Sequence, residues 1–156
     1  MHDNAQLITD LYTAFAARDG ARMEACYAPT ATFSDPVFTE LRGAEVGAMW
    51  RMLTGRAADL VVEFSGVEAD DRTGRAHWEA WYTFSATGRK VHNIIDATFE
   101  FEDGKIVKHV DVFGFYRWTR MALGVSGVLL GWTPIVQGKV RRGAREGLTA
   151  FMAKDR

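Results

Sequence analysis

The hydrophobic period of the chain changes from about 3.6 to about 2 residues after Arg56, and this change restricts the fold more than any other feature. Four consecutive segments then alternate apolar with polar side chains: residues 60–68, 76–86, 91–101 and 106–116. The breaks between them are rich in Asp, Gly and Thr, residues that favour tight turns. Consecutive strands should therefore pair as antiparallel hairpins, and we expect a curved meander.

The chain before Arg56 has mainly helical spacing. Residues 4–18 predict a first helix, with Asn4 as its candidate N-cap. The other expected elements are a shorter helix at 21–27, an extended segment at 31–38 and a third helix at 43–53. Helices first and sheet afterwards predict an α+β domain in which the helices cover one face of the sheet.

Helical spacing returns after residue 116, so we expect a main domain over residues 1–116 and a helical extension over 117–156 that packs on it. The extension carries a net charge of +6 and the rest of the chain −7, which favours contact between them. Its apolar run from Met121 to Trp132 should pack back over the body. The alternative is an unpacked basic extension or a helix on a membrane surface.

Composition limits the class of protein and its partners. A chain of 156 residues with 47% hydrophobic and 25% charged residues is typical of one soluble globular domain. A single cysteine, Cys26, argues against a disulfide scaffold and favours a reducing, cytoplasmic location. The net charge of −1 provides no general attraction to nucleic acid. We expect neither a signal peptide nor a membrane span, because the longest apolar stretch, near residues 122–132, is shorter than the roughly 20 residues a span needs.

Three short motifs stand in this pattern of elements: Asp35-Pro36-Val37, the hairpin Phe99–Ile106 and Lys108-His109-Val110-Asp111. Together they resemble the cone-shaped nuclear transport factor 2-like superfamily, which includes ketosteroid isomerases, SnoaL-like polyketide cyclases and limonene epoxide hydrolases. The resemblance covers residues 4 to about 116. It implies a cone-shaped barrel made of a strongly curved antiparallel sheet, with N-terminal helices on its concave face. The C-terminal helical segment is then an addition, and a homodimer is expected because relatives pair through the outer face of the sheet.

The resemblance places Asp35 where ketosteroid isomerases keep their general base. Loss of water at the mouth of an apolar cone would raise the pKa of this carboxyl and let it accept a proton at neutral pH. Alternatively, the Asp-Pro pair opens a turn and the carboxylate caps its own backbone. Both interpretations remain open from the sequence.

The two oxyanion-binding positions of a ketosteroid isomerase hold other residues in this chain. The tyrosine position falls on Leu11, with Tyr12 beside it, and the aspartate position falls on Ala97. Asp96 is one residue off, and a shift of one residue reverses the face of a strand. We therefore expect Asp96 on the outer face and at best weak steroid isomerisation.

His109 and Asp111 occupy one face of the last strand, together with Val107, Phe113 and Phe115. SnoaL-like cyclases carry a similar His-x-Asp, and the resemblance assigns the acid/base role to Asp111. In the functional interpretation, Asp111 orients His109 or shares a proton with Asp35, which makes all three catalytic candidates. In the alternative, the pair is a hydrogen-bonded tie between the last strand and the helices.

The last strand and the two strands before it are expected to supply the ligand-contacting side chains. These candidates are Trp78, Tyr82, Asn93, Phe99 and Phe113. Tyr82 and Asn93 are the polar members and could hydrogen-bond a ligand carbonyl. No metal or cofactor is expected, because the histidines lack zinc-site spacing and no glycine-rich loop joins a strand to a helix.

The sequence thus predicts a protein that binds a small apolar molecule with a carbonyl group. The reaction class that fits the resemblance is acid/base isomerisation or aldol-type cyclisation. Epoxide hydrolysis is disfavoured because no arginine is expected on an inward strand face. A non-catalytic ligand-binding or protein-interaction module of the same fold is the alternative.

Overall fold

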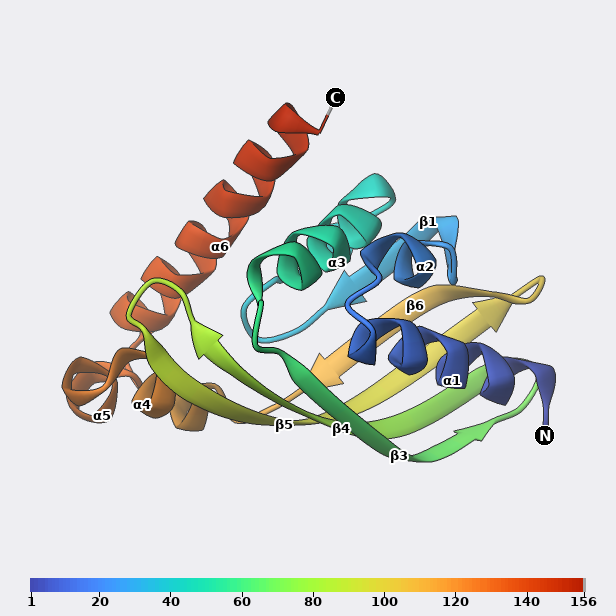
Figure 1. Cartoon of the computed structure of the whole chain (residues 1–156), viewed down its shortest axis with the longest axis horizontal. Helices are drawn as coiled ribbons and strands as arrows, with labels where there is room; N and C mark the ends of the chain where they lie inside the picture. Colours follow the sequence, from blue (N-terminus) through green and yellow to red (C-terminus); the bar gives the residue numbers. More distant parts are fainter. Residues whose placement is uncertain (156) are drawn as a thin grey trace.

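A six-stranded curved sheet forms the centre of the computed structural model, which describes residues 1–155. Its strands are β1 (Tyr27–Ser34), β2 (Leu41–Arg42), β3 (Val61–Ala69), β4 (Thr73–Phe84), β5 (Arg89–Glu102) and β6 (Lys105–Val112). Their order is β2-β1-β6-β5-β4-β3, and β3 to β6 form the predicted antiparallel meander. The sheet bends around its concave face without closing, as Figure 1 shows, so the α+β cone expected from the sequence is confirmed.

Strand β1 joins the sheet in a way that local sequence patterns do not predict. It pairs in parallel with β6, and Phe33 lies opposite His109. This pairing brings the N-terminal third of the chain beside the last strand, and the Asp35 turn follows directly at the end of β1.

Helix α1 (Asp3–Ala16) lies on the concave face and buries the side chains of Ile8, Leu11 and Tyr12 completely. Its N-cap is His2, whose Nδ1 accepts a hydrogen bond from the Asn4 backbone N–H at 3.0 Å. The prediction of Asn4 as the cap is therefore wrong. Asn4 is buried, and its side-chain amide donates instead to the backbone carbonyl of Asp70 at 3.0 Å.

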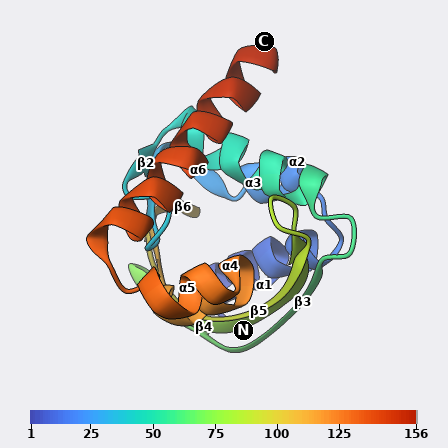
Figure 2. The same ribbon diagram turned by 90° about the vertical axis from the view of Figure 1, so that its left-hand side faces the viewer.

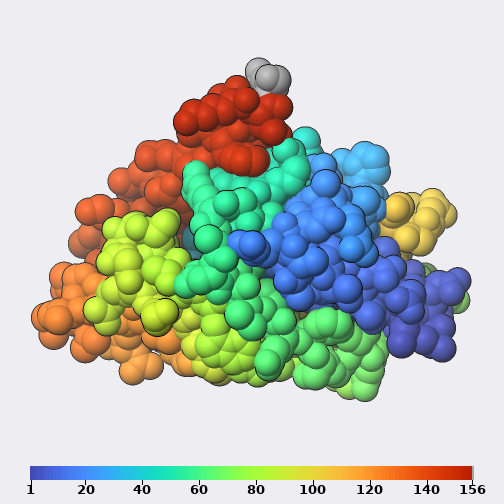
Figure 3. Space-filling model, in the orientation of Figure 1, coloured from blue at the N-terminus to red at the C-terminus, as the bar shows by residue number. Residues whose placement is uncertain are grey.

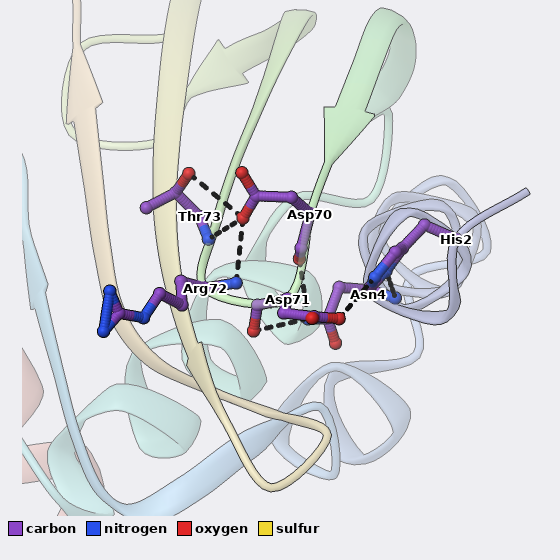
Figure 4. Close-up of polar contacts among 6 residues, drawn as sticks. All are labelled: His2, Asn4, Asp70, Asp71, Arg72 and Thr73. Carbon is purple, nitrogen blue, oxygen red and sulfur yellow. Dashed lines mark hydrogen bonds and ion pairs between the residues drawn. The ribbon is translucent and has the colours of Figure 1, made fainter.

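The turn between β3 and β4 anchors the start of α1, as Figure 4 shows. One oxygen of Asp70 accepts hydrogen bonds from the backbone N–H groups of Arg72 and Thr73, both at 2.8 Å. His2 also bonds the Asp71 carboxylate at 2.8 Å. These contacts fix the narrow end of the cone, away from the candidate site.

The remaining helices before the meander are α2 (Gly20–Glu24) and α3 (Ala44–Arg56). Helix α2 ends three residues earlier than predicted, because Tyr27 already belongs to β1. Helix α3 places Trp50 in the centre of the core, with its ring centroid 5.0 Å from that of Phe15 and 5.4 Å from that of Phe33. The concave side is therefore packed with aromatic rings at its deep end.

Three helices follow the sheet: α4 (Phe115–Leu123), α5 (Val125–Leu130) and α6 (Pro134–Lys154). The strand predicted to reach residue 116 is wrong at its end, because β6 stops at Val112 and Phe115 starts α4. The Trp118 N–H bonds the Gly114 carbonyl at 3.0 Å, and Phe115 and Trp118 are then buried together with Val91. Figure 2 shows α4, α5, α6, α3 and the β4–β5 hairpin arranged as a ring around the wide end of the cone.

Helix α6 crosses from this ring to α3, where Leu148 is buried. Ion pairs of Arg145 with Glu45 and of Arg51 with Asp155 join the basic helix to α3. The expectation that the run from Met121 to Trp132 packs back over the body is only partly correct. Ala122 in α4 is fully buried, whereas Val125, Val128, Leu129, Leu130 and Trp132 are exposed. No helix in residues 1–155 is both long enough and apolar enough to cross a membrane.

Candidate functional site

Asp35 occupies a tight turn at the rim of the cone, directly after β1. One carboxylate oxygen accepts hydrogen bonds from the backbone N–H groups of Val37 at 2.7 Å and Phe38 at 2.6 Å. The capping role considered from the sequence is thus present. It leaves the second carboxylate oxygen without a hydrogen-bond partner among the described residues, and the side chain keeps partial contact with solvent.

The surroundings of Asp35 change its acidity. The pKa of the carboxyl is raised from 3.8 to about 7, mainly by burial and in smaller part by the charge of Asp111. The two backbone N–H groups oppose this change, because they stabilise the charged form. Asp35 is consequently able to exist as both acid and base near neutral pH.

His109 lies deep in the cone and is fully buried, with hydrogen bonds to both of its ring nitrogens. Nδ1 is 2.7 Å from the hydroxyl of Tyr27, and Nε2 is 2.7 Å from a carboxylate oxygen of Asp111. The Trp50 indole N–H donates to the Tyr27 oxygen at 2.9 Å. These four residues form one continuous chain, which we call the Trp50–Asp111 chain.

Only one direction in the Trp50–Asp111 chain is set by chemistry alone. The Trp50 indole can only donate, so the Tyr27 oxygen accepts from it. The donor and acceptor roles at the two ring nitrogens of His109 depend on its tautomer. In either tautomer both ring nitrogens are engaged by protein groups.

Asp111 is 3% exposed and uses the same oxygen for a longer contact, 3.4 Å, with the indole N–H of Trp78. Its other oxygen has no hydrogen-bond partner in the part of the chain that the structure describes. The interaction that raises the pKa of Asp35 shows that the two carboxylates influence each other, one at the rim and one below it.

The five predicted ligand-contacting residues divide into two groups by depth. Trp78 and Phe99 are buried in the aromatic core, whereas Tyr82 and Phe113 are partly exposed and belong to the rim. Asn93 is 8% exposed and lies diagonally across the strand pair from Tyr82. Tyr82 and Phe113 are therefore nearer the surface than Trp78 and Phe99.

Polar groups at this rim remain available to a ligand. The Trp118 indole N–H donates to the Tyr82 oxygen at 2.8 Å, which leaves the Tyr82 hydroxyl proton free to donate. The side-chain amide of Asn93 makes no hydrogen bond with the described residues. The α6 residue Arg141 donates from Nε to the Pro36 carbonyl at 2.8 Å, so the C-terminal helix also contacts the turn that holds Asp35.

Strand register decides which residues face this site, and it differs from the sequence prediction at one point. A β-bulge shifts the pairing, so Glu100 is opposite Lys108 and Phe101 opposite Ile106. Ile106 is consequently buried in the core, and Val107, predicted to point inward, is only half-buried.

The outer face of the sheet carries polar residues that lie away from the candidate site. Asp96 is exposed and bonds Nδ1 of His77 at 2.9 Å, and Glu79 bonds Nε2 of His92 at 2.8 Å. The prediction that Asp96 faces away from the cone is confirmed. Within residues 1–155, no group of three or more His, Cys, Asp or Glu side chains is arranged to hold a metal ion.

The sequence did not predict that three residues of this region lie close to His109 or Asp111. Tyr27 and Trp50 complete the Trp50–Asp111 chain, but they lie far from His109 in sequence and no spacing relates them. The hydroxyl of Tyr12 is buried without a hydrogen-bond partner, and the negative charge of Asp111 raises the pKa of that hydroxyl after the larger effect of burial. Helical spacing indicated that Tyr12 is buried, but not that its hydroxyl would be near Asp111.

With the curved sheet, the Asp35 turn and the His-x-Asp strand in place, comparison with family models gives one match, the SnoaL-like domain, over residues 8–109. The chain belongs to the SnoaL-like domain family. The match includes Asp35 and ends at His109, so Asp111 and the C-terminal helices lie outside it. No curated protein matches the chain.

Solved structures with a similar fold include proteins to which different functions are assigned. An LEH-like epoxide hydrolase from M. tuberculosis is 18% identical, with a TM-score of 0.65, covering 81% of this chain and 96% of that one. IdmH from Streptomyces antibioticus, a proposed polyketide cyclase, is 20% identical with a TM-score of 0.62, covering 80% and 100%. An NTF2-like protein of unknown function from Burkholderia pseudomallei is 18% identical with a TM-score of 0.66, covering 78% and 98%. At these identities the likeness shows the fold alone.

Proposed function

We propose that this SnoaL-like protein binds a small apolar carbonyl compound at the rim of the cone and catalyses isomerisation or aldol-type cyclisation of it. The observation that supports this most is the pKa of Asp35, raised to about 7 at a partly exposed position. A base is most useful when its pKa lies near the working pH. The name of IdmH, a proposed polyketide cyclase of the same fold, is consistent with this reaction class.

In the proposed reaction, the Asp35 carboxylate removes a proton from the carbon beside the carbonyl group. The electron pair of that C–H bond forms a C=C bond to the carbonyl carbon, and the π pair of the carbonyl moves onto its oxygen to give an enolate. The Tyr82 hydroxyl and the Asn93 amide donate hydrogen bonds to this oxygen. The proton on Asp35 then returns to a different carbon in an isomerisation, or to the new alkoxide after the enolate carbon attacks a second carbonyl.

Asp111 and His109 act from below this site. The charge of Asp111 helps to keep the pKa of Asp35 high, and His109 holds Asp111 through its occupied Nε2. Because neither ring nitrogen of His109 is free, we assign it a positioning role rather than direct proton transfer. Steroid isomerisation should be very weak, since Leu11 and Ala97 are buried at the two oxyanion positions and can donate no hydrogen bond.

Proton exchange tests the chemistry without knowledge of the natural product. The protein is incubated in D2O with a panel of ketones of increasing size, from 2-tetralone to a 1,3-diketone and a 3-ketosteroid, and deuterium beside the carbonyl is followed by NMR. We expect exchange above the buffer rate with at least one ketone, and a decrease of roughly a hundredfold or more in Asp35→Asn.

Asp96→Asn is the matched control, because Asp96 is an exposed carboxylate on the opposite face of the sheet. It should exchange at the wild-type rate. Buffer-level exchange with every ketone, or equal rates in Asp35→Asn and the wild type, would refute the proposal.

Non-catalytic binding is the second candidate, and the packing at the deep end supports it. Trp50, Phe33 and Phe99 surround His109 with ring centroids 6.1, 4.9 and 4.3 Å from the imidazole. A ligand could not reach His109 without moving these rings. In this case the same ketones would raise the melting temperature of the protein without any exchange of their protons.

A further inference from the structure

The outer face of α5 carries a row of exposed apolar side chains. These side chains are Val125, Val128 and Leu129 of α5 and Trp132, two residues after its end, with exposures of 76%, 49%, 64% and 65%. We call these four residues the α5 ridge. Leu130 and Ile135 beside it are also exposed. Contiguous exposed apolar surface of this kind indicates an interaction site.

The exposure of the α5 ridge is built into the fold, because the inner face of α5 is held tightly. Gly127 packs so closely on α4 that a Cβ at this position would lie 1.9 Å from the Thr119 carbonyl oxygen. The Tyr116 hydroxyl, also from α4, donates to the Val128 carbonyl at 2.6 Å. Figure 1 places α5 at one end of the long axis of the molecule, and the space-filling view of Figure 3 shows this part of the chain, in orange, forming that end of the surface.

Positive charge is concentrated in the segments that precede and follow the α5 ridge. Residues 112–145 contain six Lys or Arg and no Asp or Glu. Of these, Arg120, Lys139 and Arg142 are exposed, and none of the three forms an ion pair within the described residues. Val128 of the ridge also borders a surface depression. Its other lining residues include Arg89, Lys90, Arg117 and Arg120.

We propose that the α5 ridge docks on the surface of a lipid bilayer that contains anionic lipid. Exposed Leu, Val and Trp side chains enter the boundary between headgroups and acyl chains, and the surrounding Lys and Arg side chains contact the headgroups. Trp132 is suited to this depth because indole is amphipathic and prefers the membrane interface. The site is a surface contact and requires no membrane-spanning segment.

Charge complementarity favours this occupant over two others. A second copy docking through the same ridge would bring the Lys and Arg side chains of both copies together, and like charges at an interface cost affinity. Nucleic acid would use the positive charge but gives no role to exposed Leu129 and Trp132. An anionic bilayer uses both the apolar and the charged groups.

Helix α4 connects the ridge to the rim of the cone. It packs against α5, and its Trp118 donates the hydrogen bond to Tyr82 described above. Docking at α5 would hold the rim near the membrane, where apolar carbonyl compounds accumulate. The inference itself does not depend on the chemistry proposed for Asp35, and the vesicle experiment below contains no such compound.

Vesicle sedimentation tests the proposal with the full chain. Wild-type protein is mixed with vesicles of phosphatidylcholine alone or with about one-third phosphatidylglycerol. We expect binding to the anionic vesicles that weakens as salt is raised, and much weaker binding to the neutral ones. The double variant Leu129→Glu/Trp132→Glu and the triple variant Arg120→Gln/Lys139→Gln/Arg142→Gln should each lower the partition coefficient by about tenfold or more.

Val61→Glu is the matched control, since Val61 is 53% exposed but belongs to β3. It should bind like the wild type. Circular dichroism establishes that each variant is folded. As a measurement on the unaltered fold, brominated lipid should quench part of the wild-type tryptophan emission, and Trp132→Phe should lose that part.

Three results would overturn the inference. The first is no binding of the wild type to anionic vesicles, and the second is equal binding to neutral ones. The third is a wild-type dimer that Leu129→Glu/Trp132→Glu converts to a monomer, because a second copy would then occupy the ridge.

Discussion

The two carboxylates of the site, Asp35 and Asp111, differ because of their individual surroundings. Asp111 is hydrogen-bonded to Nε2 of His109 and is held in the core. Asp35 has only backbone N–H groups as donors and sits at a rim that excludes most but not all water. In the proposed reaction, the same residue type is therefore a buried positioning group at one position and the proton acceptor at the other.

The raised pKa of Asp35 makes stability depend on pH. The folded carboxyl holds its proton up to about pH 7, whereas the unfolded one loses it near 3.8. The native state therefore binds more protons in this window, and stability falls as pH rises from about 4 to about 7. Asp35→Asn removes the effect while keeping the acceptor oxygen, so its stability relative to the wild type should be greater at pH 8 than at pH 5.

We expect the difference between the two pH values to be about 1–3 kcal/mol, after allowance for the partial exposure of the carboxyl. Urea unfolding at pH 5 and pH 8 measures it. Asp103→Asn, in an exposed turn, is the control and should show no comparable difference. A constant effect of Asp35→Asn across this range would mean that the carboxyl titrates normally.

The free energy of unfolding should depend strongly on the hydroxyl group of one buried tyrosine and little on that of another. Tyr27→Phe leaves the Trp50 N–H and His109 Nδ1 without their partner and should lower the free energy of unfolding by about 1–3 kcal/mol. Tyr12→Phe removes a hydroxyl that has no partner, so stability should stay within about 1 kcal/mol of the wild type or increase. Chemical denaturation measures both, and equal losses would show that Tyr12 is hydrogen-bonded in solution.

At the scale of elements, the departures from the sequence predictions occur where an element ends or meets another. The β-bulge between β5 and β6 adds one residue to β6, so Ile106 rather than Val107 is buried in the core. The alternation of apolar and polar residues alone cannot locate such an added residue. Phe115 and Tyr116 continue the apolar alternation of β6 but fold as α4, because Phe115 and Trp118 can then be buried side by side. Helix α5 shows the opposite case: its apolar residues suggest burial, yet only the side with Gly127 has a neighbour to pack on.

At the scale of the whole molecule, charge and surface are unevenly distributed. The basic C-terminal helix meets acidic residues of the body at only a few positions, such as Glu45, and of its other cations Lys139 and Arg142 remain at the surface. The outer face of the sheet carries paired His and acidic side chains together with exposed Ile94 and Val112. This second mixed surface lies on a different side of the molecule from the α5 ridge.

We predict that the outer face of the sheet forms a two-fold dimer, as expected from the family resemblance. Light scattering at micromolar concentration should give twice the 17.4 kDa of one chain, because interfaces of ordinary size persist at this concentration. Ile94→Glu would place two like charges near the axis and should give a monomer. A monomeric wild type would disprove this prediction.

The sequence predicted the α+β class and the meander through side-chain period and local turns, and it predicted the inward placement of His109 and Asp111 through the resemblance of its hairpin to the family. It also placed Asp35 in a turn, but it could not choose between capping and proton transfer. Only the tertiary structure brought Tyr27 and Trp50 to His109, set Asp111 close enough to Asp35 to raise its pKa, and left α5 uncovered. The physical reason is that hydrogen bonds, desolvation and exposure depend on residues distant in sequence, whereas periodicity records only the face on which a side chain lies.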